Sequence, residues 1–130
     1  MQRNFLALKQ EQNKKNMKYE ELEEKIIQWA KDRNILENSN AIKQISKTQE
    51  ELDETLEALK KLNAHKGSDN LIVRSEIMNE VADGIGDMLV TIILLAKAVD
   101  LESLVCLEMA YNEIKNRKGK MVDGLFVKEK

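Results

Sequence analysis

Proline is absent from this chain, and glycine and aromatic residues are scarce. Proline breaks helices and glycine weakens them, so a sequence with so few of both favours long helices. Aromatic residues make up only 4% of the 130 residues, which leaves aliphatic side chains to build the core. With 42% hydrophobic and 34% charged residues, the composition predicts a single all-α domain.

Cysteine, net charge and long apolar runs are also limited. The single cysteine, Cys106, excludes an intrachain disulfide and a cysteine-rich metal site, and it is expected in the core. The net charge of -2 does not favour nucleic acid as a partner. The longest apolar run, residues 88–96, is too short to span a bilayer and predicts a helix buried on nearly all sides. With no signal-peptide pattern, a cytoplasmic protein without membrane or direct nucleic-acid contacts is expected.

Apolar residues recur at helical spacing in four segments. The four predicted helices span residues 19–33, 41–62, 71–99 and 100–118. Ser39 or Asn40 is expected to cap the second helix, and the third is expected to begin near Ser75. Asp100 is the expected N-cap of the fourth helix, and Gly119 is expected to end it.

The two ends of the chain are expected to add little regular structure. Residues 1–18 predict a flexible or partly helical arm, within which Met17 is a second candidate start, and residues 19–130 predict one domain. The tail is expected to turn at Asp123 and Gly124 without a convincing strand. The helices are few, and the third is too apolar for a small monomer to cover. They predict long antiparallel helices in a four-helix bundle that homo-oligomerisation completes.

Three carboxylates, Glu80, Asp83 and Asp87, lie in the front half of the third predicted helix. At about 100° per residue, they fall within roughly 60° of one another on one helix face. Like charges buried side by side are unfavourable unless a cation neutralises them. Gly84 and Gly86 stand among them, and two explanations stay open: close packing against a neighbouring helix, or room for a metal, water or phosphate.

A second acidic cluster, Glu50, Glu51 and Glu54, lies within about one turn of the second predicted helix. Clusters made only of oxygen ligands suit Mg²⁺, with Mn²⁺ as the alternative, and such a cation polarises a phosphoryl oxygen. The alternative for this cluster is a solvated helix face with ion pairs one turn apart. A solvated face is a less suitable explanation for the acidic cluster of the third predicted helix, because the residues around that cluster are apolar.

Cationic and aromatic side chains complete the candidate residues. The end of the fourth predicted helix gathers four cations, Lys115, Arg117, Lys118 and Lys120. They are candidates for binding phosphate, and the alternative is that they complement the helix dipole. Lys47, just before the second acidic cluster, is a further candidate for phosphate contact. Trp29 is a candidate for stacking on a base, although a tryptophan in a helical apolar stripe is more often a core residue.

Two of these stretches resemble a known family. The segment EELDETLEAL resembles the EExxE signature of MazG-like nucleoside triphosphate pyrophosphohydrolases, and ADGIGDMLV resembles their second signature, ExxD, on the next helix. QWAKDR and AYNEIKNRKGKMVDGLFVKE look like the compact MazG-like proteins of phages and Firmicutes. The similarity covers roughly residues 19–128, and the order and separation of the motifs make it fairly specific.

The resemblance implies an all-α dimer or tetramer that cleaves a (d)NTP, with Mg²⁺, to the monophosphate and pyrophosphate. It implies Glu51, Glu54 and Asp87 as metal ligands, and Glu50 as a ligand or as the group that orients the water. Lys115, with Arg117 or Lys118, matches the family's phosphate-binding stretch loosely.

The chain departs from the family pattern at one position. Gly84 stands where the pattern that ends at Asp87 has glutamate. Glu80 and Asp83 form an ExxD of their own one turn earlier, and Asp83 is expected to take over the missing carboxylate. Two hypotheses follow: an Mg²⁺-dependent NTP pyrophosphohydrolase, or a non-catalytic all-α oligomer with a degenerate site that binds a nucleotide or a protein.

Overall fold

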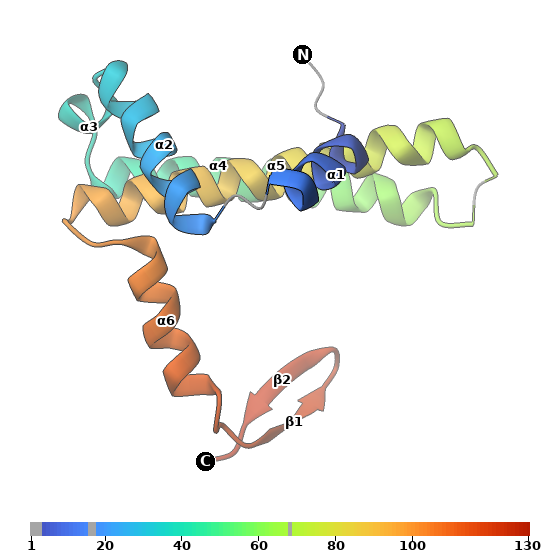
Figure 1. The fold of residues 1–130 in the computed structure, drawn as a ribbon. Helices are drawn as coiled ribbons and strands as arrows, with labels where there is room; N and C mark the ends of the chain where they lie inside the picture. The colour runs from blue at the N-terminus through green and yellow to red at the C-terminus, as the bar shows by residue number, and fades with distance from the viewer. Residues whose placement is uncertain (1–3, 16–17, 68) are drawn as a thin grey trace.

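A computed structural model describes residues 4–15, 18–67 and 69–130, and most of them are helical, as the composition predicts. The elements, labelled in Figure 1, are α1 (Phe5–Lys15), α2 (Tyr19–Asp32), α3 (Ile35–Asn38), α4 (Ala41–Ala64), α5 (Leu71–Ala98), α6 (Ser103–Ile114), β1 (Gly119–Val122) and β2 (Leu125–Lys128). No helix among the described residues is both long and apolar enough to cross a membrane.

The antiparallel pair α4 and α5 is the centre of the fold (Figure 1). Asn40 caps α4, as one of the two predicted candidates, because its side chain accepts a hydrogen bond from Lys43 N at 2.9 Å. Asn70 caps α5 in the same way, accepting from Val73 N at 3.1 Å. The prediction that this helix begins near Ser75 is therefore wrong, since the Asn70 cap starts it at Leu71.

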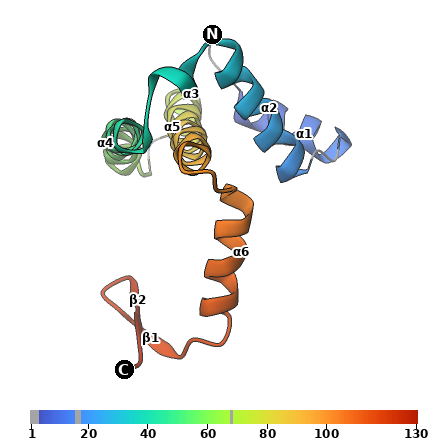
Figure 2. The ribbon, with the colours of Figure 1, turned by 90° about the vertical axis from the view of Figure 1, so that its left-hand side faces the viewer.

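Helix α2 packs against α5, and its Ala30 is fully buried. Asn34 adopts the left-handed conformation, with φ 57°, and turns the chain into the short α3 where the sequence predicts only a break. Figure 2 shows α2 and α4 on different sides of α5.

Helix α1 lies against α5 through a hydrogen bond from Phe5 N to Asn79 Oδ1, at 3.1 Å. The predicted N-terminal arm is thus helical over Phe5–Lys15. Met17, the second candidate start, lies outside the described residues.

The N-terminus of α6 is capped by a side chain of α2 and not by a residue next to it in the sequence. Asp100, the predicted cap, has a left-handed φ of 58° and lies in the turn that leaves α5. The carboxylate of Glu23, on α2, accepts hydrogen bonds from Ser103 Oγ and, at 3.3 Å, from Leu104 N. Tyr19 Oη shares a hydrogen bond with Ser103 Oγ at 2.9 Å. The capping carboxylate is therefore supplied by tertiary structure, and the prediction for Asp100 is wrong.

The C-terminal segment forms a β-hairpin, which the sequence did not predict. Helix α6 ends at Ile114, so Gly119 opens β1 instead of ending the helix. β1 and β2 pair antiparallel from Gly119 opposite Lys128 to Val122 opposite Leu125. Asp123 and Gly124, with φ of 49° and 81°, make the predicted turn. This two-residue turn joins β1 to β2, and the two strands pair with each other. The expectation that the tail forms no strand is therefore wrong.

The single chain leaves much apolar surface uncovered and does not form a four-helix bundle by itself. Its accessible surface is 10535 Å², whereas a compact monomer of 15.0 kDa exposes about 7,000 Å². Cys106 is exposed and not in the core. The run 88–96 is buried on one side only, because Ile93 and Leu94 are inside while Leu89 and Ile92 are 46% and 40% exposed.

Candidate active site

The face of α4 that meets α5 is polar. Its buried residues are Gln44, Glu51, Thr55 and Ala58, which recur at helical spacing. Thr48, one turn from Gln44, shares a hydroxyl hydrogen bond with Thr91 of α5 at 2.7 Å. The larger apolar residues of this helix form a separate leucine stripe that points elsewhere, since its members Ile45, Leu52, Leu56 and Leu59 are each about half exposed. This rotation of α4 brings its carboxylates to the boundary with α5.

Glu51 is the buried centre of the acidic site, with 9% of its surface exposed. Burial raises the pKa of its carboxyl above the ordinary value, and the charges of Glu54 and Asp87 raise it further. Lys47 opposes this rise in pKa from 3.6 Å away. Glu54 on the same helix and Asp87 on α5 are therefore near enough for their charges to act on the carboxyl of Glu51.

Lys47 forms ion pairs with two carboxylates of its own helix, Glu50 and Glu51. Its Nζ lies 3.0 Å from Glu50 Oε2 and 3.6 Å from Glu51 Oε1. The hydrogen bond to Glu50 is the main reason that the pKa of Lys47 is raised. Glu50 and Lys47 are both mostly exposed, so the pair forms the solvent side of the site, with Glu51 beneath it.

Gly84 faces the site from α5, and the structure favours close packing as the reason for this glycine. A Cβ at this position would lie 2.2 Å from Thr55 Oγ1 and 3.1 Å from Thr55 Cβ. Thr55 is itself 4% exposed, and its hydroxyl donates to Glu51 O at 2.7 Å. A glutamate at position 84 has no room at this helix separation. Thr55 was missed by the sequence reasoning, although its place one turn after Glu51 was visible.

Of the other two predicted carboxylates on α5, Glu80 is engaged elsewhere. Its Oε2 lies 3.3 Å from Lys61 Nζ. This ion pair is nearer the loop between α4 and α5 than the point where Thr55 meets Gly84. Asp83 is partly buried, one turn before Asp87 on the same helix. The six predicted carboxylates are therefore spread along the helix pair: Glu51 is buried, Asp83 and Asp87 are partly buried, and the other three are exposed.

The basic residues at the other end of the chain do not reach this site within one chain. Lys115, Arg117 and Lys118 follow α6 in the link to the hairpin, and Lys120 lies on β1. Figures 1 and 2 show this end of the molecule well away from α4 and α5. Arg117 forms an ion pair with Glu113 at 3.2 Å.

Trp29 is 44% exposed on α2, so the core alternative for this residue is wrong. The guanidinium of Arg33 covers its ring, 4.7 Å from the ring centroid. Nothing in the described part of the chain tests its predicted role in base stacking.

The donor set fits a hard divalent cation in chemistry, although it is not preassembled. Among the described residues, no three or more His, Cys, Asp or Glu side chains are placed to hold a metal ion together. Burial, and then the charges of Glu54 and Asp87, raise the pKa of Glu51, and a divalent cation bound beside it would favour the ionised carboxylate. Glu51, Glu54 and Asp87 are the residues that would hold such an ion, with oxygen ligands throughout.

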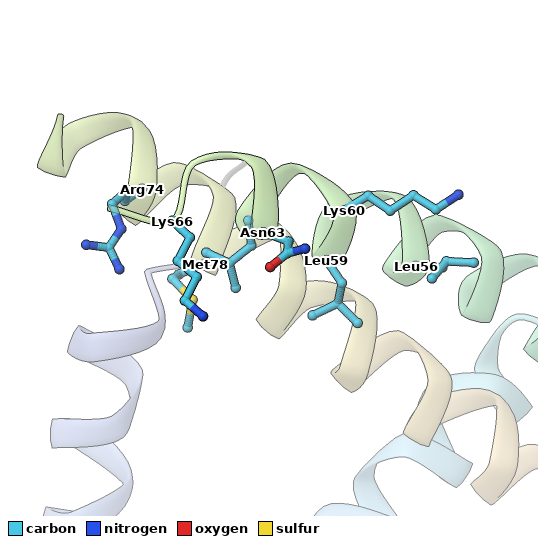
Figure 3. A pocket seen from close by; sticks show the side chains of 8 residues that line it. Leu56, Leu59, Lys60, Asn63, Lys66, Arg74 and Met78 are labelled. Carbon is cyan, nitrogen blue, oxygen red and sulfur yellow. The ribbon is translucent and has the colours of Figure 1, made fainter. Parts of the chain in front are cut away.

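The helix pair also carries an apolar hollow of about 570 Å³, nearer the loop (Figure 3). Leu56, Leu59 and Met78 line it together with the cations Lys60, Lys66 and Arg74. Leu56 and Leu59 belong to the exposed leucine stripe of α4, so this hollow is part of an uncovered apolar face and not of the carboxylate site.

Comparisons of the chain with protein-family models, with curated proteins and with solved structures found no match.

Proposed function

We propose that this protein is an Mg²⁺-dependent nucleoside triphosphate pyrophosphohydrolase that converts a (d)NTP and water to the monophosphate and pyrophosphate. The observation that carries the proposal is the burial of Glu51 between α4 and α5, beside the charges of Glu54 and Asp87. These three residues come from the two stretches that resemble the signatures of MazG-like enzymes. Like charges held at a helix boundary are typical of a cation site.

The residues of the site have distinct roles in this proposal. Glu51, Glu54 and Asp87 would hold Mg²⁺, and the bound ion would polarise the phosphoryl group and offset its charge. Glu50 orients the attacking water and accepts its proton, and its exposure leaves it open to solvent. The water oxygen bonds to the α-phosphorus, and the bond to the bridging oxygen breaks so that pyrophosphate leaves. Lys47 stabilises the charge that develops on the phosphates.

We also propose that the protein works as a homo-oligomer, either a dimer or a tetramer. The leucine stripe of α4 and the apolar residues of α6 are exposed in the single chain. The surplus of accessible surface over a compact monomer is about 3,500 Å², which is of the size that permanent assemblies bury.

A non-catalytic binding module is the second candidate. Lys47 already pairs with Glu50 and Glu51, so part of the acidic charge is neutralised without a metal ion. Such a module would hold a nucleotide or a protein on the same oligomer and release no pyrophosphate.

The experiment that separates the two candidates is pyrophosphate release from a panel of canonical and modified (d)NTPs, with Mg²⁺, Mn²⁺ or EDTA. Release that requires a metal and is lost in Glu54→Gln and Asp87→Asn supports the enzyme. Both variants remove a charge at constant size, so circular dichroism should show an intact fold. A rise in Tm with nucleotide and Mg²⁺, without pyrophosphate release, supports the binding module instead.

A further inference from the structure

The C-terminal arm, defined here as residues 103–128, leaves the rest of the chain almost at once. Glu23 holds its first turn through Ser103 and Leu104. Every residue from 105 to 130 is exposed. In Figures 1 and 2 the arm extends away from the α4 and α5 pair, with the hairpin at its far end.

The arm is apolar where a solvated segment would be polar. The register places Met121 opposite Phe126 on one face of the hairpin, and Val122 opposite Leu125 on the other. Phe126 and Leu125 are 52% and 72% exposed, so both faces of the hairpin are uncovered. An isolated two-stranded hairpin and an isolated helix of 12 residues are each marginally stable in water. The arm therefore requires a surface that covers it.

The central helix pair offers an apolar surface of matching character. The leucine stripe of α4, made of Ile45, Leu52, Leu56 and Leu59, is between 44% and 54% exposed. Leu52 stands between Glu51 and Glu54 in sequence. A segment docked on this stripe would thus lie beside the carboxylate site.

The arm cannot reach this stripe in its own chain while its root is held. Besides the Glu23 contacts, Leu101 N donates to Ala96 O at 2.8 Å, which fixes the turn between α5 and α6. A second copy meets the same requirement by exchanging arms about a twofold axis, so that each arm covers the other chain. The surplus of about 3,500 Å² over a compact monomer is sufficient for such an interface.

The arm also carries a concentration of positive charge at its far end. Arg117, Lys118 and Lys128 line a hollow of about 420 Å³ where α6 meets the hairpin, together with Glu113 and Glu129. Lys115 stands at the same end, as the C-cap of α6. At the carboxylates, Lys47 contacts Glu50 and Glu51. A triphosphate with its metal ion needs further positive side chains, and the arm is rich in them.

We propose that the C-terminal arm docks on the α4 stripe of a second copy and brings Lys115, Arg117 and Lys118 to that copy's carboxylate site. Each active site is then built from two chains, and the phosphate-binding half is missing from a monomer. The docking rests on the exposed apolar surfaces alone, whereas the delivery of cations to a triphosphate rests on the proposed function.

Mixed oligomers test the delivery of cations. One chain carries Asp87→Asn with a native arm, and the other carries Lys115→Ala and Arg117→Ala with native carboxylates. Each is expected to be inactive alone. In a dimer purified through two different tags, one of the two sites is complete, so about half of the wild-type rate of pyrophosphate release is expected. No restored activity in the mixed dimer, with an active wild type, overturns the proposal and leaves the enzymatic function standing.

Sedimentation of the full chain tests the docking without any activity. Leu125→Glu and Ile72→Glu place the same charge at residues of equal exposure, 72% and 73%, on the hairpin and on the first turn of α5. Leu125→Glu is expected to sediment as a folded monomer, and Ile72→Glu as the wild-type oligomer. Val127→Lys, on the same hairpin face, serves as a second variant if Leu125→Glu does not fold.

The two experiments separate the two proposals. A monomeric wild type, or hairpin variants that remain oligomeric, overturns the docking. A monomeric Leu125→Glu beside an oligomeric wild type that releases no pyrophosphate supports the docking and overturns the enzymatic function.

Discussion

Substitution of Gly84 by alanine tests whether the contact with Thr55 sets the separation of α4 and α5. The added Cβ would lie 2.2 Å from Thr55 Oγ1 and 3.3 Å from Thr55 Cγ2. Thr55 cannot easily turn away, because it is β-branched, buried and hydrogen-bonded to Glu51 O at 2.7 Å. The helices must therefore move apart at this level.

The expected loss of stability follows from two opposing effects. Overpacking a tight core contact costs about 1–3 kcal/mol, and replacing a helical glycine with alanine returns up to about 1 kcal/mol. At 2.2 Å the overpacking is at the upper end, so we expect a net loss of about 1–2 kcal/mol in the free energy of unfolding. This corresponds to a decrease in Tm of roughly 3–10 °C.

A double-mutant cycle with Thr55→Ala isolates the contact. Thr55→Ala removes the two atoms Oγ1 and Cγ2 and leaves Cβ at 3.1 Å, which a shift of a few tenths of an ångström relieves. In that background Gly84→Ala should be close to neutral, giving a coupling of at least about 1 kcal/mol. Urea unfolding followed by circular dichroism measures all four proteins. Wild-type stability in Gly84→Ala, or equal losses in both backgrounds, would refute the reasoning.

Three further predictions concern a charge, a cap and the hairpin. Glu51→Gln should raise the free energy of unfolding at pH 7 without divalent cations. Because the folded-state pKa of Glu51 is raised, the wild type has its full stability below its ordinary pKa of 4.5 and loses part of it as pH rises through the folded pKa. Urea unfolding should therefore show the advantage of Glu51→Gln shrinking as pH falls and disappearing below pH 4.5, and an advantage independent of pH would contradict this. Glu23→Ala should cost about 1–2 kcal/mol in thermal unfolding, since α6 loses its cap, whereas exposed Glu24→Ala is the control expected to have little effect. Gly119→Ala should open the hairpin, because its Cβ would lie 2.2 Å from Val127 O, and NMR amide shifts of β1 and β2 should move to coil values. Unchanged shifts would show that the strands adapt.

The sequence predicts well the features that depend on residues close together in the chain. Three of the four predicted helices match α2, α4 and α5, because the apolar period and the absence of proline are local properties. Asn40 was a predicted cap for the same reason. The turn at Asp123 and Gly124 was also predicted, since it depends on residues that tolerate positive φ.

The failures occur where distant residues decide the outcome. The cap of α6 comes from Glu23, 80 positions away, so the local candidate Asp100 was wrong. The hairpin was missed because four-residue strands with exposed faces have no periodic pattern against a core.

The acidic site shows the same division. The two acidic clusters and their helical spacing are properties of the sequence, and the resemblance to the MazG-like signatures implies Glu51, Glu54 and Asp87 as the candidate ligands among them. The tertiary structure alone decided that α4 turns Glu51 and Thr55, and not its leucine stripe, toward α5. It also decided that Gly84 meets Thr55 and that the basic arm lies far from the carboxylates. The physical reason is that periodicity places residues on one helix face, whereas packing of side chains between helices determines which face meets which partner.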